Sequence, residues 1–382
     1  MKQSKWFQGI KTFLAILGLL SCLGLVLIFV TNSSGVTTFL SVLGLIKTQS
    51  LYQIDSHKVI EGATAGMVDS LQDPYSKYLS KTEWEDLKSK LEAEFGGIGI
   101  YVLQDNQDRL RVVAPIKGTP AARAGLKQND IIISINGEST VGMSQDDAVH
   151  MMRGDPGTQV ILGIYRESES RELDVKIVRE IINVPSVEDK IISENPKLGY
   201  ISLNQFHALS SREMNTAVNR LMNQKVKGLV LDLRDNGGGD FDAAIAIASI
   251  FLNGQEVVSV ADARGNKTVH KATPGNVKLP LVVLVNGNSA SASEILAGAL
   301  QDNKRALLVG QQTYGKGLVQ TLYPLSNGGA LKLTTQKYFT PKGTDINKIG
   351  IHPDYVVENN NSDNQDQQLA RAIELLTKQL EK

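Results

Sequence analysis

Residues 279–300 read LPLVVLVNGNSASASEILAGAL, and this stretch decides the local fold around the most informative serines of the chain. Leu279 to Val285 is a short, almost wholly apolar run, which predicts a buried strand. Gly287-Asn288 predicts the turn that ends this strand. The residues from Ser291 to Leu300 have helix-forming composition. The stretch therefore predicts a strand, a turn and a helix whose first turn contains Ser291.

A serine in this position has two interpretations. The first N–H groups of a helix have no intrahelical partner, and together with the helix dipole they favour negative charge. An oxyanion formed by attack of Ser291 would be stabilised there. The structural alternative is a capping box, because Ser291-x-x-Glu294 has the spacing at which serine and glutamate satisfy each other's backbone N–H groups.

Lys316 favours the catalytic interpretation. It lies in GQQTYGKG, residues 310–317, which nearly matches the phosphate-binding loop G-x-x-x-x-G-K-[ST]. The match fails at Gly317, which has no hydroxyl for magnesium, and the following Leu318 to Leu322 predicts a strand where that loop requires a helix. A lysine between glycines and apolar residues can instead be desolvated, which lowers its pKa toward that of a general base. Neutral Lys316 could then accept the serine proton.

These motifs resemble those of the carboxyl-terminal processing proteases, also called tail-specific proteases, a family with a serine–lysine dyad and an embedded PDZ domain. The resemblance extends from about Gly62 to Asp354, and its specificity comes from the order and spacing of the motifs. The matching segments are residues 61–76, the glycine loop near Gly97, residues 233–239 (LRDNGGG), the Ser291 and Lys316 motifs, and residues 350–354 (GIHPD).

The resemblance assigns roles to five residues of the expected active site. It implies that Ser291 is the nucleophile, that Lys316 is the base and that the Gln320 amide orients the lysine amine. It also implies that the N–H groups of Gly237 and Ala292 form the oxyanion hole. The alternatives are a solvent-facing strand residue at position 320, a plain turn at position 237, and a serine–histidine triad that uses one of two histidines, His270 or His352.

Residues 95–178 resemble a PDZ domain. The resemblance implies that the backbone of Gly97, Ile98, Gly99 and Ile100 receives a peptide C-terminus, with the following strand edge pairing with the peptide. Ser144 to Arg153 is the expected groove helix. On it, Val149 and Met152 are expected to contact peptide, with core packing as the alternative. The resemblance implies that Arg153 makes a regulatory contact to the protease core. The alternative is that Arg153 is a cation at the C-terminus of the helix that interacts with the helix dipole.

The N-terminal residues predict a membrane anchor. Thr12 to Val30 is apolar and uncharged, and its length is near the minimum needed to cross about 30 Å of hydrocarbon. The preceding Lys2, Lys5 and Lys11 place the N-terminus in the cytoplasm and the rest of the chain outside. A cleaved signal peptide is the alternative. Cys22 is the only cysteine, so a disulfide within the chain is excluded.

The predicted fold class is α+β and multidomain, with a transmembrane helix, a helical segment, a β-rich PDZ domain and an α/β crotonase-like protease core, the last two implied by the resemblance. A length of 382 residues is enough for several hydrophobic cores. The formal net charge of zero provides no electrostatic footprint for nucleic acid. The expected domains are residues 1–34 (cytoplasmic tip and anchor), 35–91 (helical region), 92–181 (PDZ), 182–358 (protease core) and 359–382 (linker and terminal helix).

The predicted function is a membrane-anchored, exported serine endopeptidase that recognises protein C-termini through its PDZ domain and hydrolyses peptide bonds with a Ser-Lys dyad. It is predicted to be a single-pass membrane protein with its catalytic domain extracellular or periplasmic. Its expected partners are protein substrates, with no cofactor, no metal and no nucleic acid. The resemblance implies homodimer formation through the helical region, with simple packing against the protease as the alternative. The competing function is a non-catalytic exported PDZ scaffold.

Overall fold

Two units make up the chain, residues 1–72 and residues 73–382. The structure is a computed structural model, and it describes residues 13–14, 16–19, 21, 33–52, 55–92, 94–105, 107–275, 277–359 and 365–381. The first unit contains helices α2 (Ser33–Gln49) and α3 (Ser56–Asp69). Asp55 caps α3, because its side chain accepts the N–H of His57 at 2.9 Å.

The predicted anchor, Thr12 to Val30, lies mostly outside the described residues. Those of its residues that are described, between Phe13 and Ser21, are helical. Within the described ranges, no helix combines the length and the apolar character needed to cross a bilayer. The membrane anchor therefore stays a prediction.

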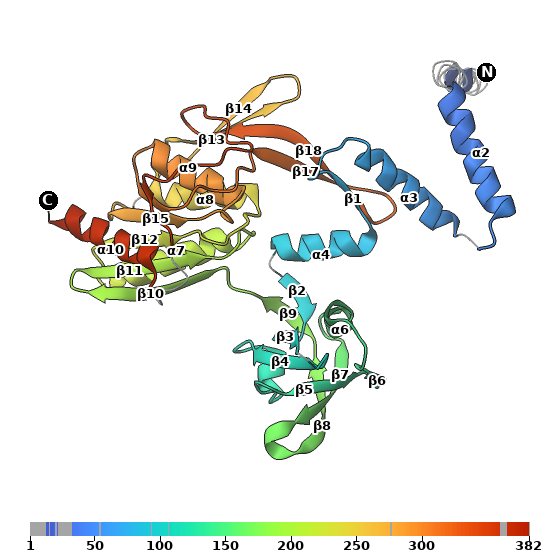
Figure 1. The fold of residues 1–382 in the computed structure, drawn as a ribbon, viewed down its shortest axis with the longest axis horizontal. Coiled ribbons are helices and arrows are strands. Elements are labelled where there is room, and N and C mark those ends of the chain that lie inside the picture. Colours follow the sequence, from blue (N-terminus) through green and yellow to red (C-terminus); the bar gives the residue numbers. More distant parts are fainter. Residues whose placement is uncertain are drawn as a thin grey trace, which may run out of the picture. The chain divides into compact units, whose positions relative to one another are not determined.

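In the second unit, the region predicted to be a PDZ domain forms a six-stranded sheet of order β3-β4-β5-β7-β8, with β6 paired to β5 (Figure 1). Asn136 and Gly137 form a tight two-residue turn between β5 and β6, and both have the positive φ that such a turn requires. A separate two-stranded ribbon pairs β2 (Glu94–Gly97) with β9 (Glu180–Asn183). The elements of this region are β3 Ile100–Gln104, β4 Leu110–Pro115, α5 Pro120–Arg123, β5 Ile131–Ile135, β6 Glu138–Ser139, α6 Gln145–Met152, β7 Gln159–Arg166, η1 Glu167–Glu169 and β8 Arg171–Val178.

A second six-stranded sheet forms the centre of the remaining chain, in the order β10-β11-β12-β15-β16-β19. The β10–β11 pair is antiparallel and the other pairs are parallel. The apolar run of residues 281–285 becomes β15, which is buried along its whole length, as expected for a central parallel strand. The bounds are β10 Val187–Glu194, β11 Lys197–Leu203, β12 Gly228–Asp232, β15 Leu281–Val285, β16 Leu307–Gly310 and β19 Tyr355–Val356.

Helices cover both faces of this sheet. One face packs against α7 (Ser210–Asn223), α8 (Phe241–Phe251) and α9 (Ala292–Asp302) in the largest core cluster. The other face packs against the amphipathic C-terminal helix α10 (Gln367–Leu380). Leu229 and Leu231 point to the first face and Val230 to the second, which is the alternation expected along a strand.

A five-stranded antiparallel sheet completes the protease core, and helices α8 and α9 contact its strand β13 (Figure 1). Its strands are β1 Lys77–Leu79, β13 Glu256–Asp262, β14 Lys267–Lys271, β17 Leu318–Pro324 and β18 Ala330–Phe339. The helix α4 (Lys81–Glu92) follows β1. The sequence predicts helices in this part of the chain, and strand β1 is not recognisable in it because three residues are too few for a clear alternation.

Candidate functional site

A cavity of about 580 Å³ brings together all five residues expected at the active site: Gly237, Ser291, Ala292, Lys316 and Gln320. Its walls come from the loop after β11, the loop between β12 and α8, the start of α9, the Lys316 segment with β17, and β18. Helix α4 contributes Leu87, Lys90 and Leu91. Residues that are far apart in the sequence thus meet at one cavity.

Ser291 is the N-cap residue of α9, and its backbone is strained. Its φ is 57° and its ψ is −115°, a conformation that side-chain-bearing residues rarely adopt. The capping box predicted from Ser291-x-x-Glu294 is present, and the Glu294 carboxylate accepts the Ser291 N–H at 2.9 Å. The Tyr338 hydroxyl donates to the Ser291 carbonyl oxygen at 3.1 Å. Capping and catalysis are therefore compatible at this serine.

The glycine turn after β12 lies directly against Ser291. A Cβ atom on Gly238 would stand 2.8 Å from the Ser291 Cβ and 2.7 Å from the Ala290 carbonyl oxygen, and its φ is +97°. Only glycine fits such a position without displacing its neighbours. Among the described residues, the N–H groups of Gly237 and Ala292 have no hydrogen-bond acceptor. Two free N–H groups at one cavity wall suit an incoming negative oxygen.

Lys316 is half-buried and lies two residues before β17. Within the described chain its Nζ makes no hydrogen bond or ion pair, and it lies 4.9 Å from the centre of the Tyr75 ring. Burial lowers the pKa of Lys316, and the charge of Lys332 lowers it further, while Glu294 and Asp73 act in the opposite direction. The net effect favours the neutral amine, which is the form that accepts a proton.

The Glu294 carboxylate links the start of α9 to the segment that contains Lys316. It is fully buried and accepts the N–H of Ser291 at 2.9 Å and the N–H of Lys316 at 2.9 Å. It also accepts the Gly315 N–H at 2.7 Å and the Thr313 hydroxyl at 2.6 Å. Because a buried carboxylate must be satisfied by donors, these bonds fix the Lys316 loop relative to α9.

Gln320 lines the cavity from β17, where the pairing with β18 shifts register between Val319 and Gln320. Such an irregularity re-aims the side chains that follow it. The Gln320 amide nitrogen donates to the Leu318 carbonyl at 3.3 Å and to the Thr334 hydroxyl at 3.4 Å. The structure thus places Gln320 beside the cavity with its amide nitrogen toward Thr334. The expected role of Gln320 in orienting the Lys316 amine stays a prediction.

The residues expected to receive a peptide C-terminus run from the last residue of β2 to the first residue of β3. Ile98 is buried and its carbonyl accepts the Ala121 N–H at 2.9 Å. Gly99 has φ +77° and packs against Thr119. Strand β3, which starts at Ile100, is at the edge of its sheet and contacts α6. An edge strand offers unpaired backbone groups to a further strand.

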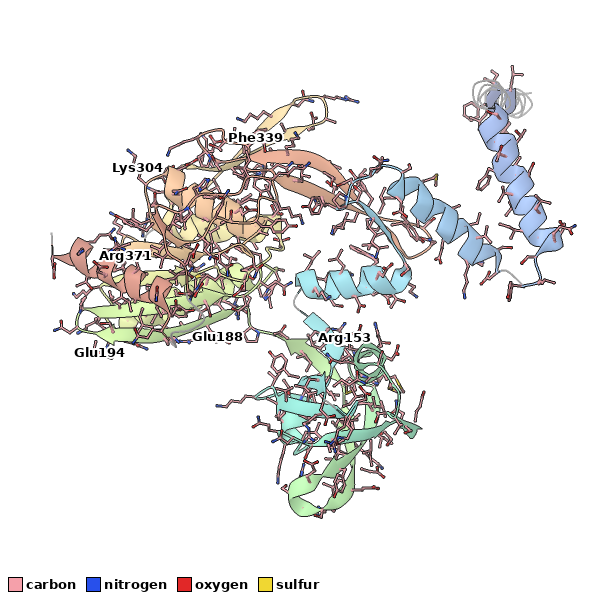
Figure 2. The ribbon with its side chains drawn as sticks, viewed as in Figure 1. Arg153, Glu188, Glu194, Lys304, Phe339 and Arg371 are labelled. Carbon is pink, nitrogen blue, oxygen red and sulfur yellow. The ribbon has the colours of Figure 1, made fainter. Side chains whose placement is uncertain are left out.

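The helix expected from Ser144 to Arg153 is present as α6, with Ser144 as its N-cap, and its role in a peptide groove stays a prediction. Met152 is buried in the core of this region and Val149 packs against the same core, so core packing accounts for at least part of both side chains. Arg153, labelled in Figure 2, follows the last residue of α6. Its guanidinium pairs with Asp86 of α4 at 2.9 Å and lies 4.8 Å from the centre of the Phe95 ring.

The histidines of the alternative triad do not line the cavity. The His270 ring instead makes an edge contact with Phe241, and the backbone carbonyl of His352 accepts a hydrogen bond from Gln301. Among the described residues, no group of three or more His, Cys, Asp or Glu side chains could hold a metal ion.

Sequence reasoning missed three features of this site. Glu294 was interpreted only as a capping residue. It is, however, the only charged residue between Ser291 and Leu300, and a charged side chain in such an apolar helix was a signal that it needs further hydrogen-bond partners. Gly238 was given no role, although it lies next to Gly237 in the LRDNGGG motif. Tyr75 carried no signal of its contact with Lys316, since only the tertiary fold brings them together.

Family models match three parts of the chain. The model described as peptidase family S41 matches residues 197–357, and the PDZ domain model matches residues 111–166. A third model, the N-terminal domain of activating protease CtpB, matches residues 31–83.

Named proteins are similar over most of the chain. The carboxy-terminal-processing protease of Bartonella bacilliformis is 43% identical over 320 residues, which is 82% of this chain and 73% of the relative. The carboxy-terminal processing protease CtpA of Bacillus subtilis is 37% identical, over 82% of this chain and 67% of the relative. The solved structure of a photosystem II D1 C-terminal processing protease has a TM-score of 0.51 and 30% identity, covering 87% of this chain and 90% of that one.

Proposed function

Because this chain belongs to the carboxy-terminal processing proteases, which are serine-type peptidases of family S41, we propose that it cleaves peptide bonds with Ser291 as nucleophile and Lys316 as general base. The observation that carries this proposal is the shared cavity, which contains Ser291, Lys316 and the free N–H groups of Gly237 and Ala292. Among the described residues that line that cavity there is no histidine.

The chemistry begins with neutral Lys316. Its Nζ accepts the Ser291 hydroxyl proton while Oγ attacks the peptide carbonyl carbon. The carbonyl oxygen becomes negative and receives hydrogen bonds from the N–H groups of Gly237 and Ala292. Collapse of the tetrahedral intermediate breaks the C–N bond, and the leaving amine takes the proton from Lys316. Water then attacks the acyl-enzyme with Lys316 again as base, which releases the acid product and restores Ser291.

Gln320 completes this arrangement as the residue that orients the lysine amine. Two observations support the assignment: Gln320 lines the same cavity as Lys316, and it follows a register shift in β17. Its amide nitrogen is engaged by Thr334, which leaves the amide oxygen as the acceptor for a lysine N–H.

The substrate is a protein whose C-terminus binds to the PDZ domain. The loop from Gly97 to Ile100 receives the terminal carboxylate and the edge of β3 pairs with the extended peptide. Val149 and Met152 of α6 line the apolar side of this site. The position of β3 at a sheet edge next to α6 supports this assignment.

Arg153 is the proposed regulatory residue. It contacts Asp86 of α4 and the Phe95 ring, and α4 also lines the catalytic cavity. Peptide binding to the PDZ domain can change activity only if the peptide has different affinities for two arrangements of the enzyme. Arg153→Ala should therefore weaken activation by long substrates and leave labelling of Ser291 by a small probe unchanged. If both activities fall together, Arg153 is not a switch.

The N-terminal segment is proposed to anchor the enzyme, with the catalytic part exported. The apolar run of residues 12–30 after three lysines supports this orientation. The mature protein should keep its N-terminus and sediment with membranes, and protease added outside intact cells should degrade the part after Thr31. A mature N-terminus beyond Val30 would show that the segment is a cleaved signal peptide.

The central test measures cleavage of an unfolded protein by the full-length wild type in detergent and compares it with cleavage by the Ser291→Ala variant. The proposal requires cleavage by the wild type and none by the variant. Binding of C-terminal peptides without any cleavage would identify the chain as a PDZ scaffold instead.

A further inference from the structure

The segment Asp73–Ser76 enters the protease core beside Lys316. It directly precedes β1, which pairs with β18. Ser76 is buried, its hydroxyl donates to the Asp73 carboxylate at 2.5 Å, and its oxygen accepts the Thr334 N–H at 3.0 Å. The same carboxylate accepts the Tyr75 N–H at 3.1 Å. The backbone of Tyr75 is therefore held in place on both sides.

The Tyr75 side chain contacts the Lys316 segment at two points. Its ring faces the Lys316 amine, with 4.9 Å between Nζ and the ring centre. Its hydroxyl lies beside Tyr314. Burial is the largest cause that raises the pKa of Tyr75, and the side-chain hydrogen bond with Tyr314 is the next. Tyr75 consequently stays a neutral phenol, whose ring face is negative and attracts a cation.

The ring is the contact that positions the amine. Within the described chain, the Lys316 Nζ makes no hydrogen bond and no ion pair, so no acceptor fixes the end of this flexible side chain. An aromatic face within about 6 Å attracts an ammonium group and still leaves it free to lose a proton. A carboxylate at the same place would hold the proton more strongly.

We propose that Tyr75 is a positioning residue, whose ring face holds the Lys316 amine at the wall of the catalytic cavity and stabilises its protonated form. This inference rests on the proposed role of Lys316 as the base. It means that a residue outside both sequence motifs of the dyad sets the resting position of the base. It also means that the ring and the surrounding burial act on the amine in opposite directions.

The other charged groups near the amine come from β18, α9, the entering segment, α4 and the start of α8. Lys332 on β18 opposes its protonation, whereas Glu294 on α9 and Asp73 in the entering segment favour it. Lys90 of α4 and Asp240, the N-cap of α8, also line the cavity. All of these groups are kept constant when only the ring at position 75 is changed.

The test varies the ring face without changing its shape. Full-length Tyr75→Phe keeps the negative ring face, whereas Tyr75→pentafluorophenylalanine removes it in a side chain of nearly the same outline. Acetylation of Lys316 by acetic anhydride, followed across pH by mass spectrometry, reports the protonation of this amine directly. Tyr323→Leu, which changes an exposed aromatic residue on β17, is the matched control.

We expect the acetylation midpoint of the fluorinated variant to lie about half a pH unit or more below that of Tyr75→Phe. Tyr323→Leu should match the wild type. Tyr75→Leu should also shift downward, which provides a second variant if the fluorinated chain does not fold. Equal midpoints for the Phe and fluorinated variants, or an upward shift in both the fluorinated and the Leu variant, would overturn the proposal.

Labelling of Ser291 by a small serine-reactive probe separates this inference from the proposed function. If Lys316 is the base, the pH midpoint of labelling moves together with the acetylation midpoint. If acetylation shifts and labelling does not, the ring contact is established and the role of Lys316 as base fails.

Discussion

Ser291 and Lys316 donate their backbone N–H groups to the same oxygen atom, Oε2 of Glu294, each at 2.9 Å. The start of α9 and the segment before β17 are therefore fixed to each other through one buried carboxylate. The distance between the proposed nucleophile and base depends on this link rather than on a direct bond between the two side chains.

Replacing Glu294 should damage both stability and reactivity. Glu294→Gln brings amide hydrogens toward the N–H groups of Ser291, Gly315 and Lys316, and each buried donor left unpaired costs about 1–3 kcal/mol. We expect a lower free energy of unfolding and labelling of Ser291 slowed by about tenfold or more. Denaturant unfolding and probe kinetics measure the two effects, with the exposed Glu358→Gln as the control. Labelling at the wild-type rate would contradict the positioning role.

Removing the proposed base should abolish cleavage. Lys316→Ala removes the amine that is proposed to accept the Ser291 proton, whereas His270→Ala and His352→Ala leave the residues that line the cavity unchanged. We expect no peptide cleavage at neutral pH for the lysine variant and most of the activity for the two histidine variants. Circular dichroism checks that each variant is folded. Substantial activity of folded Lys316→Ala would exclude the dyad.

The pH profile should follow the neutral amine of Lys316. Burial and the charge of Lys332 lower the pKa of Lys316, so the rate should rise with pH and level off above that lowered pKa. Lys332→Met removes one of the two lowering effects, so its profile should move toward higher pH. Rates of Ser291 labelling between pH 5 and about pH 10 test this. A flat wild-type profile, or a Lys332→Met profile displaced toward acid, would contradict the assignment.

Neighbouring glycines should differ sharply in tolerance. Gly238→Ala places a Cβ atom 2.8 Å from that of Ser291, at a φ of +97°, whereas the same atom at Gly237 meets nothing within 4 Å. Backbone strain and displacement of Ser291 should make Gly238→Ala inactive, while Gly237→Ala should fold normally and retain much more activity. Comparison of cleavage rates and unfolding midpoints decides between this expectation and equal effects.

The C-terminal helix should lose stability when its cap is removed. Asp366 caps α10 through the Leu369 N–H at 3.0 Å and pairs with Arg234 at 2.8 Å. Loss of the cap in Asp366→Ala should cost about 1 kcal/mol. Although burial acts in the opposite direction, the bonds from Arg234 and Leu369 leave the pKa of Asp366 lowered. The stabilisation is thus present above the unfolded pKa of about 3.9 and is lost as pH falls through the lower, folded value.

Urea unfolding of wild type and Asp366→Ala at several pH values measures this. The difference between the two proteins should shrink below about pH 4. A difference that grows on acidification would contradict the predicted sign.

The sequence by itself determined the local elements of the site. The apolar run 279–285 predicted β15, the serine-rich stretch predicted the start of α9, and the residues after Lys316 predicted β17. These predictions succeed because strand and helix formation depend on patterns of neighbouring residues. The same stretch left two alternatives open for Ser291, a helix cap and a nucleophile. The motif order further placed Lys316 and the glycine turn among the site residues.

Only the tertiary structure decided how these elements meet. No local pattern reveals that the Glu294 carboxylate reaches Gly315 and Lys316, that Gly238 leaves no room beside Ser291, or that the Tyr75 ring faces the Lys316 amine. Each of these contacts joins segments that are separated along the chain. Their geometry follows from the packing of α9 between two sheets, and local periodicity carries no information about that packing.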